Sequence, residues 1–118
     1  MLKRISTQIP AEALNWQVHE LLLVIDNEQR TYNRKIAMFK NLFKKLSKGT
    51  FDKNKAPKLF AMLTDDVARE YNKSYGGVDS NYKISTQARR IADVKLVEEF
   101  LQAVENKDYD FMRYVPKR

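Results

Sequence analysis

The residues of this sequence that could do catalytic chemistry are few and poorly spaced for it. His19 is the only histidine and the chain has no cysteine, so thiol nucleophiles, disulfides and the common His/Cys zinc sites are excluded. Asp65 and Asp66 are adjacent, as are Glu98 and Glu99, and neighbours on a helix point about 100° apart, so neither pair can work together as acid and base. No phosphate-binding glycine loop, zinc-protease motif or calcium loop is present. We therefore expect no enzyme, no metal site and no cofactor.

A strongly basic stretch from Thr31 to Lys58 carries the positive charge of the chain. It contains nine lysine and arginine residues and one acid, Asp52, so its formal charge of +8 exceeds the +7 of all 118 residues. Its apolar residues recur at intervals of three and four, which predicts an amphipathic helix with one apolar stripe and cationic faces. The stripe consists of Tyr32, Ile36, Phe39, Phe43 and Leu46.

A cationic helix followed by a cationic loop can neutralise the phosphates of a nucleic acid. The candidate contacts are Arg34, Lys35, Lys40, Lys44, Lys45, Lys48, Lys53, Lys55 and Lys58. Because lysine outnumbers arginine here, we expect backbone contacts and salt-dependent binding to DNA or RNA, without strong sequence preference. The simpler interpretation is that these cations are only the solvated side of an amphipathic helix. The sequence leaves both interpretations open.

The last twelve residues, 107–118, form a tail that is basic at its end and too rich in apolar residues to be free in solvent. Its candidate contact residues are Tyr109, Phe111, Met112 and Tyr114. We expect the tail to dock either on the body of the protein or on a partner. The alternative function is therefore protein interaction or assembly, through an acidic protein surface or a second copy of the chain.

Stacking of unpaired bases would require exposed aromatic rings. The candidates near loops and chain ends are Tyr75, Tyr82, Tyr109 and Tyr114. Nothing in the sequence selects among them.

Composition predicts the all-α class and a compact single domain spanning residues 1–118. Gly and Pro occur only three times each, and 43% of the residues are hydrophobic. We expect about four helices, near 10–26, 28–48, 54–75 and 85–106, preceded by an N-terminal arm, 1–9. The longest apolar run, Leu21 to Ile25, is far too short to span a membrane. We expect a cytoplasmic protein without membrane contact.

Several residues predict where the helices begin and end. Pro10 suits a first turn, and Gly49 should end the basic helix. Asp52 or Asn54 can cap the third helix, Gly76-Gly77 should end it, and Ser85 or Thr86 can cap the last one. Around residues 26–28 two readings are open. The chain either breaks there, with Asp26 or Asn27 as a cap, or continues as one long helix, and we favour a break.

The same periodicity predicts the core. We expect it to contain Leu14, Val18, Leu21, Leu22, Ile25, Phe39, Phe43, Leu46, Phe60, Leu63, Val67, Ile91, Val94 and Leu101.

A combination of residues in the middle of the chain also suggests a setting. It comprises Ile25-Asp26-Asn27, Tyr32, Lys40-Asn41-Leu42, Lys48-Gly49, Asp52, Lys55-Ala56, Lys58-Leu59-Phe60 and Tyr71. On these residues, a segment of about 50 of the 118 residues resembles a group of small uncharacterised helical proteins of phages, other mobile elements and metagenomic sequences. The resemblance implies a mobile-element origin. That group has no assigned activity, so the resemblance implies no functional residue.

Overall fold

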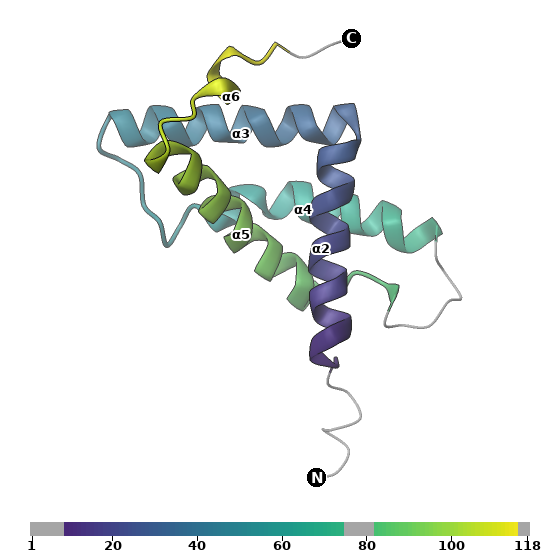
Figure 1. Cartoon of the computed structure of the whole chain (residues 1–118). Coiled ribbons are helices and arrows are strands. Elements are labelled where there is room, and N and C mark those ends of the chain that lie inside the picture. Colours follow the sequence, from purple (N-terminus) through teal and green to yellow (C-terminus); the bar gives the residue numbers. More distant parts are fainter. Residues whose placement is uncertain (1–8, 75–81, 116–118) are drawn as a thin grey trace.

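A computed structural model describes residues 9–74 and 82–115, and this part of the chain is helical, with no strand among the described residues. Its elements are α2 (Ala11–Asn27), α3 (Gln29–Ser47), α4 (Pro57–Ser74), α5 (Thr86–Glu105) and the single turn α6 (Asp110–Arg113). The predicted all-α class is confirmed. α5 lies against both α2 and α4, and α6 lies on α3 (Figure 1). None of the helices in the described ranges combines the length and apolar character that crossing a bilayer requires.

The chain breaks between α2 and α3, as we expected. Glu28 has an extended backbone, with φ −106° and ψ 129°, and α3 then runs across the end of α2 (Figure 1). The buried hydroxyl of Thr31 donates to the carbonyl oxygens of Ile25, at 2.8 Å, and Glu28, at 3.1 Å, so it joins the two helices at the corner. The expected cap is wrong, because Glu28 and neither Asp26 nor Asn27 occupies the N-cap position of α3.

The end of α3 follows the prediction closely. Gly49 has a φ of +76°, a conformation that glycine adopts without the steric cost of a side chain. Its N–H donates to the carbonyl of Leu46 at 3.2 Å, and the N–H of Thr50 donates to that of Lys45 at 2.9 Å. These two bonds form a Schellman motif, which satisfies carbonyls at the end of the helix.

The next helix, α4, begins at Pro57, three residues later than we predicted. The reason is that Asp52 organises a turn instead of a helix start. Its carboxylate accepts from the N–H of Asn54 at 2.9 Å, and its carbonyl accepts from the N–H groups of Lys55, at 3.1 Å, and Ala56, at 2.9 Å. Residues 48–56 therefore form an ordered connection between α3 and α4.

The start of α5 is fixed by a side-chain cap and by an amide from α4. Ser85 is the N-cap and accepts from the N–H of Ala88 at 3.1 Å, which confirms one of the two caps that we predicted. The amide of Asn72 donates to the carbonyl of Ile84, at 3.0 Å, and accepts from its N–H, at 2.7 Å. The predicted helix stop at Gly76-Gly77 lies outside the described residues.

One hydrophobic cluster joins all five helices. Of the predicted core, seven residues are buried: Val18, Leu21, Ile25, Phe39, Phe60, Leu63 and Val67. Six are partly buried against them: Leu14, Leu22, Phe43, Leu46, Ile91 and Leu101. The prediction for Val94 is wrong, because its side chain is 46% exposed.

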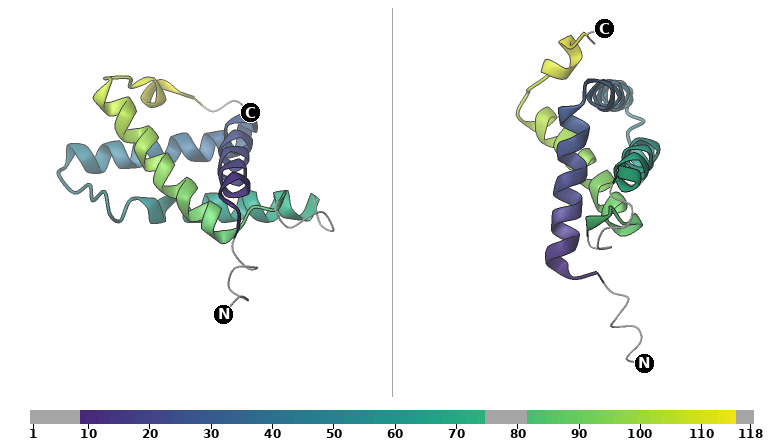
Figure 2. Two further views of the ribbon diagram at one scale, coloured as in Figure 1. Left: turned by 60° about the horizontal axis from the view of Figure 1, so that its bottom comes forward. Right: turned by 90° about the vertical axis from the view of Figure 1, so that its right-hand side faces the viewer.

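The error at Val94 arises from the composition of α5, which has apolar residues on several sides. The face that α5 buries follows a spacing of four, through Ala88, Ala92, Leu96 and Phe100. α5 packs against α2 and α4, and Figure 2 shows these helices in two further views. The three core residues that we predicted in this helix, Ile91, Val94 and Leu101, lie outside this row of buried residues.

Candidate nucleic-acid interface

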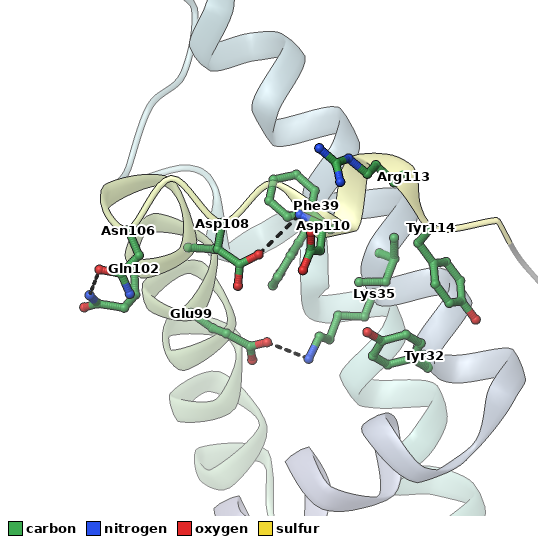
Figure 3. A pocket seen from close by; sticks show the side chains of 13 residues that line it. Tyr32, Lys35, Phe39, Glu99, Gln102, Asn106, Asp108, Asp110, Arg113 and Tyr114 are labelled. Carbon is green, nitrogen blue, oxygen red and sulfur yellow. Dashed lines mark hydrogen bonds and ion pairs between the residues drawn. The ribbon is translucent and has the colours of Figure 1, made fainter.

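Of the nine predicted phosphate contacts, three bind other groups of the protein and six are exposed. Lys35 is one of the three. Its side chain is only 3% exposed. The ammonium group donates to Asp26 Oδ1 at 2.6 Å. It also donates to Glu99 Oε2 at 2.7 Å (Figure 3). It also lies 5.5 Å from the ring centroids of Tyr32 and Phe39, a distance suitable for cation–π attraction. The expectation that Lys35 contacts phosphate is therefore wrong.

The two carboxylates determine the charge state of Lys35. Burial alone would lower its pKa, because a low dielectric disfavours the ammonium form. The hydrogen bonds and negative charges of Asp26 and Glu99 outweigh burial and raise the pKa above the ordinary value of 10.5. Lys35 is thus held as a cation, which makes it a poor nucleophile and a strong structural link between α2, α3 and α5.

Two further predicted contacts are engaged within the protein. Arg34 forms an ion pair with Asp66 of α4, with an N–O distance of 3.2 Å. Lys40 donates from Nζ to the backbone carbonyl of Tyr114 at 2.9 Å. These two cations would have to leave their partners within the protein in order to bind phosphate. We therefore leave both out of the candidate nucleic-acid interface.

The other six predicted contacts are exposed and lie close together along the chain. We call them the lysine tip: Lys44, Lys45, Lys48, Lys53, Lys55 and Lys58. They occupy the last turns of α3, the connection to α4 and its first turn, which lie at one end of the molecule (Figure 1). Among the residues that the structure describes, none of these six ammonium groups forms an ion pair or a side-chain hydrogen bond.

The local fold keeps the tip positive. Asp52 is the one acid in residues 44–58, so this segment carries a net charge of +5. The carboxylate of Asp52 already accepts from a backbone N–H within its own turn. The Schellman motif at Gly49 and the turn at Asp52 hold the lysine-bearing backbone in one conformation, although the side chains themselves extend into solvent.

The C-terminal segment, residues 109–115, docks on the body of the protein. Phe111 is 7% exposed, and its ring centroid lies 5.7 Å from Phe39, 6.0 Å from Phe43 and 5.9 Å from Phe100. This aromatic cluster joins α6 to α3 and α5. Of the two destinations that we considered for the tail, the body is the one that the structure shows.

The four predicted partner contacts in this segment also divide into residues that pack on the protein and residues that are exposed. Tyr114 packs edge-on against Tyr32 at 5.3 Å, and its hydroxyl donates to Asn33 Oδ1 at 2.7 Å, so it serves the fold together with Phe111. Tyr109 and Met112 remain 39% and 37% exposed. Only these two of the four residues still offer apolar surface to a partner.

A cavity of about 610 Å³ lies beneath the docked segment, between α3, α5 and α6 (Figure 3). Its charged lining consists of Lys35, Glu99, Asp108, Asp110 and Arg113. Two of these groups already bind each other, since Lys35 is paired with Glu99. No group of three or more His, Cys, Asp or Glu side chains within residues 9–74 and 82–115 is arranged to hold a metal ion.

Sequence reasoning missed one buried charge, Asp93. Its carboxylate accepts from the hydroxyl of Thr64 on α4 at 2.7 Å, and its other oxygen lies 3.4 Å from Nε of Arg90. Burial raises the pKa of Asp93, while the bond from Thr64 and the charge of Arg90 act in the opposite direction. No spacing signal identified this residue, because a single acid within an apolar helical pattern is usually solvated.

Comparison with protein-family models, with curated proteins and with solved structures identified no match to this chain. The resemblance to phage and mobile-element proteins stays a hypothesis, and the candidate interface depends on geometry and charge alone.

Proposed function

We propose that the protein is a non-catalytic binding module whose lysine tip contacts the backbone of a nucleic acid. The observation that carries the proposal is the concentration of six exposed lysines at one end of the molecule, without ionic partners among the described residues. Cations that stabilise a fold are usually paired with carboxylates, as Lys35 and Arg34 are here. The tip has no such role within the described protein, and its charge is complementary to a polyanion.

The chemistry of the tip favours phosphates over bases. Each lysine ammonium acts as a point charge on a flexible stem, without the planar fork that arginine uses for bidentate recognition. We therefore propose binding with weak sequence preference. Affinity should depend strongly on salt, because each phosphate contact releases condensed counterions. Six such contacts correspond to a loss of about 10³ in affinity between roughly 50 and 200 mM salt.

Fluorescence anisotropy with a labelled oligonucleotide, as a duplex and as a single strand, tests the proposal. The variant Lys53→Gln/Lys55→Gln removes two tip charges from the exposed connection. The matched control Lys73→Gln/Lys95→Gln removes two exposed lysines that lie on α4 and α5 outside the tip. Both variants lose the same net charge, so only position differs between them.

We expect the tip variant to bind more weakly and to lower the slope of log Kd against log salt by about 2, while the control stays close to wild type. Absence of binding by the wild-type protein at roughly 50 mM salt would refute the proposal. Equal weakening in the two variants would also refute it, because the effect would then depend on total charge and not on the tip.

A second candidate is self-association or binding of a protein partner through the C-terminal segment. The specific observation in its favour is the outward exposure of Met112 and Val115 beside Tyr109. Light scattering coupled to gel filtration measures the mass of the protein in solution. A dimer that becomes a monomer in the variant Met112→Glu would support this candidate, and a monomeric wild-type protein would exclude self-association.

A further inference from the structure

Tyr109 is partly exposed, although Phe111 and Tyr114 of the same segment dock on the protein. Its side chain is 39% exposed, whereas Phe111, two residues later, is buried in the aromatic cluster. The Tyr109 ring rests on Phe43, with 5.2 Å between the ring centroids. One part of the Tyr109 ring is therefore supported by the protein while another part is open to solvent.

The support beneath Tyr109 belongs to the part of α3 that leads into the lysine tip. Phe43 belongs to the last turns of α3 and directly precedes Lys44 and Lys45. In the view of Figure 1, the connection from α5 to α6 passes α3 near the same end. An aromatic surface and a cluster of phosphate-binding cations thus lie on adjoining parts of the molecule.

Two exposed acids, Asp108 and Asp110, flank Tyr109 in the sequence. Asp108 and Asp110 line the cavity beneath the segment, and Tyr109 is not part of that lining. The carboxylate of Asp108 accepts from the N–H of Asp110 at 3.3 Å, so it is directed along its own turn. Lys107, which precedes Asp108 in the sequence, is exposed and adds a positive charge to this segment.

We propose that Tyr109 is a stacking platform for an unpaired base of a strand whose phosphates contact the lysine tip. This inference rests on the proposed function and refines it, because it names single-stranded nucleic acid as the preferred ligand. In a duplex each base is already stacked between its neighbours and is not available to a side chain on the protein surface. An unpaired base can lie against the open part of the ring with little sequence selectivity.

The supported ring is suited to this role. Contact with Phe43 already restricts the Tyr109 side chain, so a base that stacks on it needs to immobilise few further torsions. Lysines that contact the backbone on either side of the base would keep the strand in place. The same two components, an aromatic platform and a basic path, are the general basis of single-strand binding.

The experiment uses the full chain and a labelled oligothymidine of roughly 16 nucleotides, alone and paired with its complement. We expect the variant Tyr109→Ala to weaken single-strand binding by about fivefold or more and to leave duplex binding unchanged, while Tyr109→Phe retains wild-type affinity. Met112→Ala is the matched control, since Met112 has nearly the same exposure on the same segment. It should change neither affinity.

The possible failures are distinguishable. If the wild-type protein binds both forms and Tyr109→Ala weakens neither, or weakens both equally, stacking is refuted while the lysine tip stands. If Met112→Ala weakens single-strand binding as much as Tyr109→Ala does, the effect belongs to docking of the segment, and stacking is again refuted. If the wild-type protein binds neither form, the proposed function and this inference fail together.

Discussion

Replacing both carboxylates that hold Lys35 should destabilise the protein more than the two single replacements added together. The single variants are Asp26→Asn and Glu99→Gln. After either one, the ammonium group keeps one ionic partner at 2.6 or 2.7 Å. After both, a cation that is only 3% exposed has no carboxylate left among the described residues.

The expected magnitudes follow from burial. Each carboxylate is about half exposed, so solvent screens its pair with Lys35, and each single replacement should cost on the order of 1 kcal/mol. The double replacement leaves an uncompensated buried charge, which costs about 3–5 kcal/mol. The coupling between Asp26 and Glu99 should therefore be about 1–3 kcal/mol.

Urea unfolding monitored by far-UV circular dichroism measures these free energies at neutral pH. Adding Lys35→Met to the double variant removes the unpaired charge and should restore most of the lost stability, because methionine fills a similar apolar volume. At alkaline pH the wild-type protein should lose the stabilisation that Lys35 gains from Asp26 and Glu99. The raised pKa of Lys35 means that the contribution is complete below the ordinary value of 10.5 and is lost as pH rises through the folded-state value. Additivity within about 0.5 kcal/mol, or failure of Lys35→Met to rescue, would refute this reasoning.

Three further substitutions probe other parts of the fold. Gly49→Ala should cost about 1–2 kcal/mol in urea unfolding, because an added Cβ meets no atom within 4 Å and the cost is that of a positive φ alone; an unchanged midpoint would contradict this. Phe111→Ala should cost about 3 kcal/mol and release the tail to proteolysis, since three phenylalanine rings lose a buried partner; an intact tail would refute the docking role. The raised pKa of Asp93 implies a contribution that is complete below its ordinary value of 3.8 and is lost as pH rises through the folded-state value. The wild-type protein should therefore gain stability relative to Asp93→Asn on acidification, and a parallel pair of pH profiles would refute it.

The boundaries of the helices were predictable where single residues determine the backbone. Gly49 ends α3 because glycine tolerates a positive φ, and Ser85 caps α5 because its hydroxyl can accept from an exposed N–H. We predicted the break after α2, but not the hydrogen bond that stabilises it, which the Thr31 hydroxyl donates to the carbonyl of Ile25. In each case the cause lies within a few residues along the chain.

Predictions that depended on distant partners were less successful. Lys35 resembles its basic neighbours in the sequence, yet it is bonded to Glu99, 64 residues away. Phe111 resembled a contact for a partner, but three rings from α3 and α5 surround it. In α5, the buried face could not be chosen because apolar side chains occur on several sides. Charge counts and periodicity describe one helix at a time, and these residues are determined by how the helices pack.

The division of α3 explains why a cluster of unpaired positive charge lies at one end of the described structure. Along the first half of the helix, carboxylates from α2, α4 and α5 approach closely enough to pair with Lys35 and Arg34. Past Lys40, no carboxylate of residues 9–74 and 82–115 lies within 4 Å of a lysine of the tip. Neutralising the inner cations stabilises the fold, and the outer cations keep a positive charge that is available to the polyanion we propose as the ligand. A formal excess of +7 spread evenly over the surface would give weak, unlocalised attraction, whereas our proposal predicts that +5 within residues 44–58 attracts several neighbouring phosphates.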